Sequence, residues 1–119
     1  MKTAVIIGSE GQDGQYLFNY LELIQYRVIG VGRNTIRTNL DEDIQPLNIN
    51  SLEEVSSFIM KICPDEIYYL AAHHHSSEDV IKDEGSLINL SYQTNVIAYT
   101  HFLESIRIYI PQTRIFYAA

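Results

Sequence analysis

A short apolar segment, a glycine-rich turn and an amphipathic segment follow one another at the start of this 119-residue chain. The glycines are Gly8, Gly11 and Gly14, and they come directly after the β-branched and small apolar residues 3 to 7. That apolar run is too short for a helix and therefore predicts a buried strand. Apolar residues recur at helical spacing further on, so a helix is expected to begin near Gln12. This strand–turn–helix pattern constrains the fold more than any other feature of the sequence.

Each glycine has its own task in this interpretation. Gly8 allows a tight turn with positive φ. Gly11 has no Cβ, so a ligand phosphate can approach the main chain, and Gly14 lets the helix pack closely against the strand. The N–H groups at the start of the helix, with the positive end of its dipole, would then face an anion. The alternative is an ordinary corner without a ligand, in which Asp13 only stabilises the helix dipole.

The composition is that of a globular domain, because 46% of the residues are hydrophobic. No apolar run is long enough to span a membrane, and the segment that ends at Gly8 is too short for a secretory signal. The net charge of −7, from 15 acidic and 8 basic residues, disfavours nucleic acid as a partner. The single cysteine, Cys63, cannot form an internal disulfide, and we expect a cytoplasmic location.

Strand and helix signals alternate along the whole chain. Further strands are expected at residues 27–32, 44–49, 66–71 and 114–118, and further helices between Ser51 and Pro64 and at residues 86–108. The third strand is weak because Pro46 interrupts it, whereas Ser51 and Glu54 form a capping box for the next helix. We expect one α/β domain over residues 1–119, a Rossmann-type doubly wound parallel sheet. Its strand order would be 3-2-1-4-5, with the glycine loop at the switch point where ligands bind.

The residues after the second predicted strand indicate which dinucleotide would bind. In nicotinamide-cofactor folds an acidic residue there bonds the ribose 2′-hydroxyl of NAD, whereas a basic residue accommodates the 2′-phosphate of NADP. This chain has Arg33 and Asn34 at that point, and the next acid is Asp41. A guanidinium group binds phosphate in a bidentate way, so Arg33, with Arg37 as a second candidate, favours NADP over NAD. The alternative, in which Arg33 is a solvated loop residue, leaves NAD possible.

Several segments resemble the extended short-chain dehydrogenase/reductases, the family of NAD(P)-dependent epimerases and dehydratases. Residues 8–14 with Tyr16 and Leu17 resemble the family's glycine loop, and the Gly-Gln-Asp-Gly centre is most similar to that of GDP-mannose 4,6-dehydratases. Residues 64–72 resemble the family's segment ending in Asn-Leu-Ala-Ala, and later segments, from Asn95 and from Arg114, resemble the following helix and strand. The resemblance covers the whole chain, and the glycine loop is its specific part.

The resemblance implies a set of cofactor-binding residues. The pyrophosphate and the adenosine ribose would be held by Gly8, Gly11, Gln12, Asp13 and Gly14. The 2′-phosphate would meet Arg33, next to Asn34, and the adenine would lie beside Asn48 and Ile49, where the family usually has Asp-Leu. The path to the nicotinamide would be lined by Leu70, Ala71, Ala72 and His73. The chain departs from the family pattern at Asn48, at Tyr69, which replaces Asn, and at His73, which replaces Gln.

The family's catalytic groups are absent from this sequence. The family uses a Ser or Thr just after the fifth strand and a Tyr-x-x-x-Lys on the next helix, and this sequence ends at Ala119. We therefore expect the NADP-binding portion of a nucleotide-sugar dehydratase, which does not turn over substrate by itself. The alternatives are another epimerase or reductase of the family, and a non-catalytic dinucleotide-binding or interaction module.

Two further expectations concern partners. We expect self-association into a homo-oligomer, either through the apolar edge of the fifth strand or through the helix surface around residues 87–108. His73, His74 and His75 are candidate zinc ligands, but nothing places enough further ligands near them to complete a site. We prefer a polar lip at the end of the fourth strand, and no metal is expected.

Overall fold

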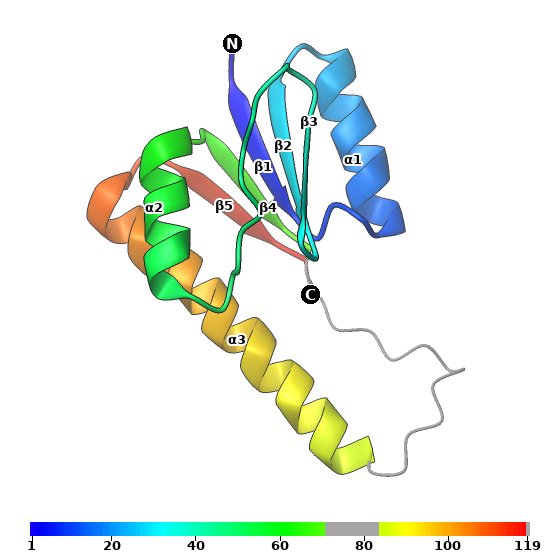
Figure 1. Cartoon of the computed structure of the whole chain (residues 1–119), viewed down its shortest axis with the longest axis vertical. Coiled ribbons are helices and arrows are strands. Elements are labelled where there is room, and N and C mark those ends of the chain that lie inside the picture. Colours follow the sequence, from blue (N-terminus) through cyan, green and yellow to red (C-terminus); the bar gives the residue numbers. More distant parts are fainter. Residues whose placement is uncertain (71–83, 119) are drawn as a thin grey trace.

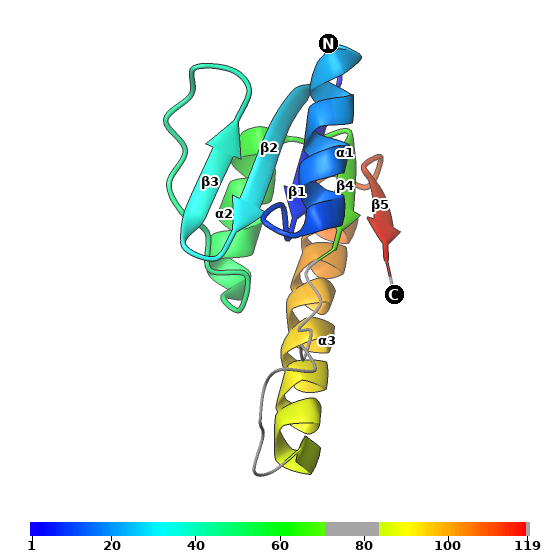
Figure 2. The ribbon, with the colours of Figure 1, turned by 90° about the vertical axis from the view of Figure 1, so that its right-hand side faces the viewer.

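The computed structural model describes residues 1–70 and 84–118, with side chains described outside residues 84–95. In this part of the chain, five strands form a sheet in the order β3-β2-β1-β4-β5. The strands are β1 (Thr3–Ile7), β2 (Arg27–Gly32), β3 (Thr35–Thr38), β4 (Glu66–Tyr69) and β5 (Arg114–Tyr117). Helix α1 (Gln12–Leu23) covers one face, and α2 (Leu52–Ile62) and α3 (Glu84–Tyr109) lie on the other (Figures 1 and 2). The predicted Rossmann-type α/β fold and its strand order are confirmed.

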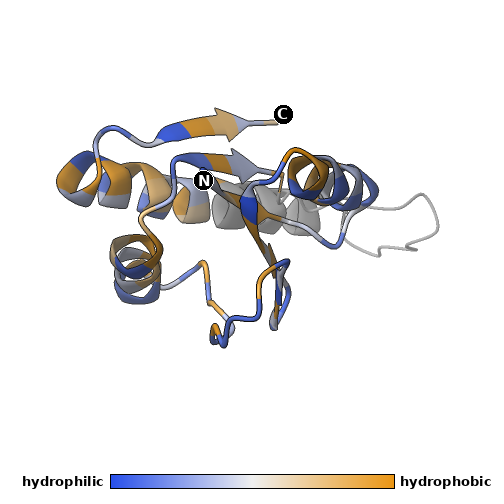
Figure 3. Ribbon diagram, turned by 90° about the horizontal axis from the view of Figure 1, so that it is seen from above, coloured by the Kyte–Doolittle hydropathy of each residue, from blue (hydrophilic) through white to orange (hydrophobic). Residues whose placement is uncertain are grey.

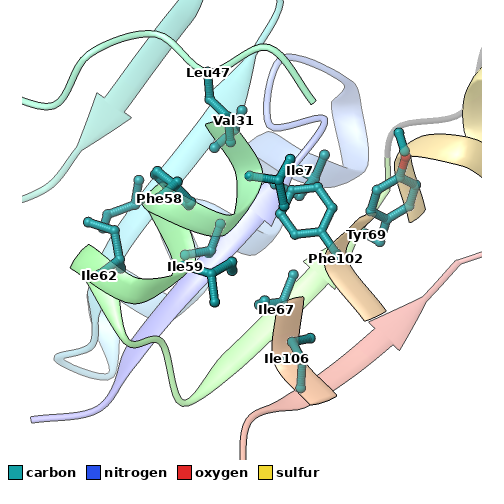
Figure 4. Packing of buried hydrophobic residues seen from close by; sticks show 14 of the residues in the cluster. Ile7, Val31, Leu47, Phe58, Ile59, Ile62, Ile67, Tyr69, Phe102 and Ile106 are labelled. Carbon is teal, nitrogen blue, oxygen red and sulfur yellow. The ribbon is translucent and has the colours of Figure 1, made fainter. Parts of the chain in front are cut away.

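Helices cover both faces of the sheet, so a hydrophobic core lies on each side of it and the central strand is buried. All five residues of β1 are buried, as is typical of a parallel strand covered by helices. Ala4 and Ile6 pack with Phe18 of α1. Val5 and Ile7 belong to the larger cluster formed with α2 and α3, which Figure 4 shows. The helices that cover these cores carry hydrophobic and hydrophilic residues on different sides (Figure 3).

The third strand does not lie where the sequence predicted it. Residues 44–49 form no strand, and β3 is instead Thr35–Thr38, which pairs antiparallel with β2. Arg33 and Asn34 make the two-residue turn between them, and Asn34 adopts a left-handed φ of 60°, which asparagine tolerates. The β-branched residues of β3 suit an edge strand, whereas Pro46 cannot donate a ladder hydrogen bond. The other pairs of neighbouring strands are parallel.

Two helices bury only part of the apolar stripe that helical spacing indicates, because Leu21 of α1 and Phe102 and Ile106 of α3 are buried but other members are exposed. Helical spacing predicts that Tyr16 and Tyr20 of α1 and Ile97 and Leu103 of α3 are buried, but all four are exposed. The buried residues are Gly14, Phe18 and Leu21 of α1 and, in the part of α3 whose side chains are described, Ala98, Phe102, Ser105 and Ile106. Each buried face contains a small residue, which a search for large apolar side chains does not weigh.

Helix α2 begins and ends where the sequence predicted. The Ser51 hydroxyl accepts a hydrogen bond from the N–H of Glu54 at 3.2 Å and so acts as the N-cap. The Glu54 carboxylate accepts from the N–H of Asn48 at 3.3 Å, rather than from that of Ser51 as in a full capping box. Cys63 ends the helix with a φ of 49°, directly before Pro64.

Polar side chains anchor the segment that follows β3. The Asn39 side chain accepts a hydrogen bond from the N–H of Val28 at 2.8 Å and donates one to the carbonyl of Tyr26 at 2.7 Å, so it pairs with the start of β2 as a strand would. The Arg27 guanidinium donates to both carboxylate oxygens of Glu42, at 2.5 and 2.9 Å. These hydrogen bonds hold the pKa of Glu42 below its usual value.

We predict that Glu42→Gln lowers the free energy of unfolding at neutral pH by about 1 kcal/mol, because the ion pair is bidentate and partly buried. Folding lowers the pKa of Glu42, so this contribution is complete above the unfolded pKa of 4.5 and disappears as the pH falls through the lower folded value. Urea unfolding at about pH 7 and about pH 2.5 measures the difference.

The matched control is Glu104→Gln, which removes the ion pair between Glu104 and Arg107 on α3. The side chains of that pair are 45% and 70% exposed, against about a quarter for Glu42 and Arg27, so a much smaller loss is expected. An equal loss of stability for Glu42→Gln at both pH values would contradict the role given to its charge.

Candidate functional site

The glycine loop lies at the carboxyl end of β1, beside the turn between β2 and β3 (Figure 1). Gly8 has a φ of 90°, as the sequence predicted. Its N–H donates to the carbonyl of Val31 at 2.8 Å, and the N–H of Ser9 donates to the same oxygen at 3.3 Å. Main-chain hydrogen bonds therefore hold the loop against β2.

The other two loop glycines differ in how much room they have. A Cβ on Gly14 would lie 2.5 Å from the carbonyl oxygen of Gly8 and 2.7 Å from the Cα of Ser9, so no larger residue fits without a shift of the main chain. A Cβ on Gly11 would meet the Gly8 oxygen at 3.7 Å, an ordinary contact, and the φ of −70° at Gly11 suits any residue. Gly14 thus serves close packing, as predicted, whereas Gly11 leaves open space above the main chain.

The start of α1 offers main-chain donors to an anion. The first N–H groups of a helix have no partner inside the helix, and here they belong to Gln12, Asp13 and Gly14. Gly11 is the N-cap residue and provides no side-chain hydrogen bond to them. The side-chain amide of Gln15 donates a hydrogen bond to the carbonyl of Glu10 at 2.8 Å and so links the helix to the loop. With the helix dipole pointing the same way, this corner suits a phosphate group.

Arg33 is placed where a basic residue was expected. It follows the last residue of β2 directly and is exposed, as is its neighbour Asn34. Arg37 is engaged elsewhere, with its guanidinium carbon 3.8 Å from the centre of the Phe18 ring and a hydrogen bond of 3.3 Å to the side chain of Asn19. Of the two arginines considered from the sequence, Arg33 is therefore the candidate at the end of β2.

The structure brings an acidic residue to the end of β2 that the sequence did not predict there. Glu10 of the glycine loop lies over Gly32, where an added Cβ would come within 2.6 Å of the Glu10 Cγ and Cδ atoms. Its Oε1 atom accepts a hydrogen bond from the Thr35 hydroxyl at 2.7 Å. The spacing rule seeks this acid about twenty residues after the loop, so it misses one supplied by the loop itself. A glycine at the end of β2 and a threonine after the turn were the available signals.

Asn48 and Ile49 lie in the segment that enters α2. Asn48 is exposed, and its side-chain oxygen accepts a hydrogen bond from the N–H of Asn50 at 3.0 Å. Ile49 is partly buried against the larger core cluster, and its carbonyl oxygen lies 3.1 Å from Nδ1 of His101. The Asn48 side chain thus shapes its own turn, and its predicted contact with adenine stays a prediction.

Leu70 lies at the end of β4, next to the glycine loop's strand. Its N–H donates to the carbonyl of Ile7 at 2.7 Å. Tyr69, which precedes it, is buried with its ring against those of Tyr99 and Tyr117, and burial raises the pKa of Tyr69 to about 12. The remaining residues predicted to line the nicotinamide path, Ala71, Ala72 and His73, lie outside the described residues.

Residues 1–70 and 84–118 were compared with the patterns of a metal cluster and of a membrane-spanning helix. No three His, Cys, Asp or Glu side chains among them come together as a possible metal site. The histidines at positions 73–75 lie outside these ranges. None of the helices described above is both long and apolar enough to cross a membrane.

Comparisons with known proteins agree with this geometry. A model of the NAD dependent epimerase/dehydratase family matches residues 4–119. GDP-mannose 4,6-dehydratase from Yersinia enterocolitica is 34% identical over 90 residues, which cover 63% of this chain and 24% of that protein. Among solved structures, UDP-glucose 4-epimerase from Brucella ovis in complex with NAD has a TM-score of 0.75 at 13% identity. A dTDP-4-dehydrorhamnose reductase from Bacillus anthracis in complex with NADP has a TM-score of 0.69 at 20% identity.

The matched regions cover most of this chain but only a small part of each of the other proteins. The two structures cover 98% and 97% of this chain, and the chain covers 35% of each of them. It thus spans between a quarter and about a third of the length of its relatives. At these identities the two structures show the fold, whereas the family model extends over almost every residue. The chain therefore belongs to the NAD-dependent epimerase/dehydratase family.

Proposed function

We propose that this chain is the NADP-binding portion of a nucleotide-sugar dehydratase similar to GDP-mannose 4,6-dehydratase. The observation that carries the proposal is the start of α1, where Gly11 leaves both the helix N–H groups and the space above them uncovered. The 34% identity to the dehydratase from Yersinia enterocolitica favours this branch of the family.

The residues predicted from the sequence assign a place to each part of the cofactor. The N–H groups of Gln12, Asp13 and Gly14 would hold the pyrophosphate. Arg33 would bind the 2′-phosphate at the end of β2, with NAD accepted less well. The adenine would lie near Asn48 and Ile49, and Leu70 with residues 71–73 would lead to the nicotinamide.

The proposal separates the chain from an enzyme that contains it. When bound, the nicotinamide would accept and return a hydride, which is the chemistry that nucleotide-sugar dehydratases and epimerases need. The chain spans only a quarter to a third of the length of its relatives, so cofactor binding is the one activity proposed for the chain itself. Nucleotide-sugar binding and turnover are proposed for the enzyme that contains it.

Self-association is part of the proposal because α3 exposes apolar side chains. Ile97 and Ile108 are 50% and 52% exposed, and their spacing of eleven residues puts them on one side of the helix. Exposed apolar groups of this kind are typical of contact surfaces between subunits.

We predict that Gly11→Ala folds normally and weakens NADP binding at least tenfold, because its methyl group fits the chain but occupies the space for phosphate. Calorimetric titration with NADP measures the dissociation constant, and circular dichroism checks the fold. The control is Leu23→Ala, an exposed change at the far end of α1. Unchanged affinity in Gly11→Ala would exclude the loop as the phosphate site.

We predict that Arg33→Gln raises the dissociation constant for NADP about tenfold and leaves that for NAD unchanged, since only NADP carries the 2′-phosphate. The same titration with both dinucleotides gives the result. If wild-type chain binds NAD more tightly than NADP and Arg33→Gln alters neither constant, the role of Arg33 is refuted.

We predict that the chain sediments as an oligomer at high concentration and that Ile97→Asp shifts it toward monomer, because a charge on the apolar side of α3 disfavours its burial. Analytical ultracentrifugation over a concentration series measures this. The control is Leu23→Asp, which puts the same charge on exposed apolar surface of α1. A wild-type chain that stays monomeric throughout would contradict the expectation.

A further inference from the structure

The end of β2 in this chain carries two opposite charges rather than one. Arg33 follows Gly32 in the sequence, and the Glu10 carboxylate lies over Gly32 from the glycine loop. In dinucleotide-binding folds an acid at the end of this strand bonds the 2′-hydroxyl of the adenosine ribose, and a basic residue there suits a 2′-phosphate. The chain therefore places both kinds of recognition group at one position of the fold.

Glu10 is held at this position at both its main chain and its side chain. The neighbouring N–H group of Ser9 is bonded to the carbonyl of Val31, and the Glu10 carbonyl accepts from the amide of Gln15. The carboxylate accepts from the Thr35 hydroxyl at 2.7 Å. Two main-chain contacts thus hold the backbone at Glu10, and the Thr35 hydroxyl orients its side chain, although Glu10 is exposed to solvent.

Two glycines of β2 make the space in which the loop residues lie. A Cβ on Gly30 would lie 2.7 Å from both side-chain atoms of Ser9, and a Cβ on Gly32 would overlap the side chain of Glu10. Residues two apart on a strand point to the same face, so both gaps open on the face that α1 covers. The position of Glu10 is therefore built into β2 and does not depend on the Thr35 hydroxyl alone.

The charge of Glu10 is not paired with a cation in the described part of the chain. The ion pairs found there join Arg27 to Glu42 and Arg107 to Glu104. Thr35, which holds the Glu10 carboxylate, is a neutral donor. A second hydrogen-bond donor, such as a ribose hydroxyl, would be bound favourably, and a phosphate dianion would be repelled.

We propose that Glu10 is a specificity-determining residue, whose carboxylate accepts a hydrogen bond from the 2′-hydroxyl of NAD and opposes the 2′-phosphate of NADP. The inference rests on the proposed dinucleotide site. Arg33 and Glu10 then act in opposite directions, so the chain discriminates only weakly between the two cofactors. Thr35 acts as a positioning residue, because it orients the carboxylate without touching the ligand.

The test compares dissociation constants of NAD and NADP for wild-type chain and Glu10→Gln. We expect Glu10→Gln to bind NADP about fivefold more tightly and NAD no more tightly, because the repulsion is removed and a weaker acceptor remains. The control Glu22→Gln makes the same change in net charge in the last turn of α1 and should leave the ratio unchanged. Adenosine 2′,5′-bisphosphate and AMP as probes should reproduce the shift with the ribose end alone.

A second variant tests whether the orientation of the Glu10 carboxylate by Thr35 affects the choice between NAD and NADP. Thr35→Val removes the donor that orients Glu10, and we expect the ratio to move toward NADP by less than in Glu10→Gln, with Thr35→Ser restoring it. Raising the salt concentration should shrink the difference between Glu10→Gln and wild type, since it screens the repulsion.

The outcomes distinguish this inference from the function on which it rests. If wild type binds both dinucleotides and Gly11→Ala weakens both, but Glu10→Gln leaves their ratio unchanged, Glu10 has no role in specificity and the proposed function stands. If neither wild type nor Glu10→Gln binds either dinucleotide, both proposals are overturned.

Discussion

The hydrogen bond from the N–H of Gly8 to the carbonyl of Val31 joins the glycine loop to β2, and the geometry of the candidate site depends on it. The main chain approaches this closely because glycines stand where the loop meets α1 and β2. Gly14 lets α1 lie against the loop, and Gly30 makes room for Ser9. A tight turn at the end of a buried strand thus becomes a rigid corner with helix donors pointing outward.

Local patterns predicted most of the fold. Strand β2 has the predicted bounds, β1 and α1 begin where expected, and Ser51 caps α2, because each depends on neighbouring residues alone. The third strand was missed because a two-residue turn at Arg33 starts a short antiparallel pair, which the expectation of alternating strands and helices does not include.

The candidate site, like the fold, was predicted from the sequence only in part. The shape of the loop could be predicted from its glycines, and the place of Arg33 from a residue count. The contact between Glu10 and Thr35 joins residues 25 positions apart, and it depends on how the loop settles on β2. A contact between residues so far apart leaves no periodic pattern in the sequence from which it could be predicted. The buried faces of α1 and α3 were also missed in part, since Gly14 and Ala98 occupy them while larger apolar residues face solvent.

The hydrogen bonds of the Asn39 side chain limit how far the number of residues between β2 and Asn39 can vary. Its amide bonds two main-chain groups at the start of β2, as a further residue of a paired strand would. An inserted or deleted residue between Gly32 and Asn39 would carry the amide out of reach and leave both groups unsatisfied. Residues 43–50 belong to no helix or strand and follow the ion pair of Glu42, so natural variation in chain length should accumulate there and spare the hairpin.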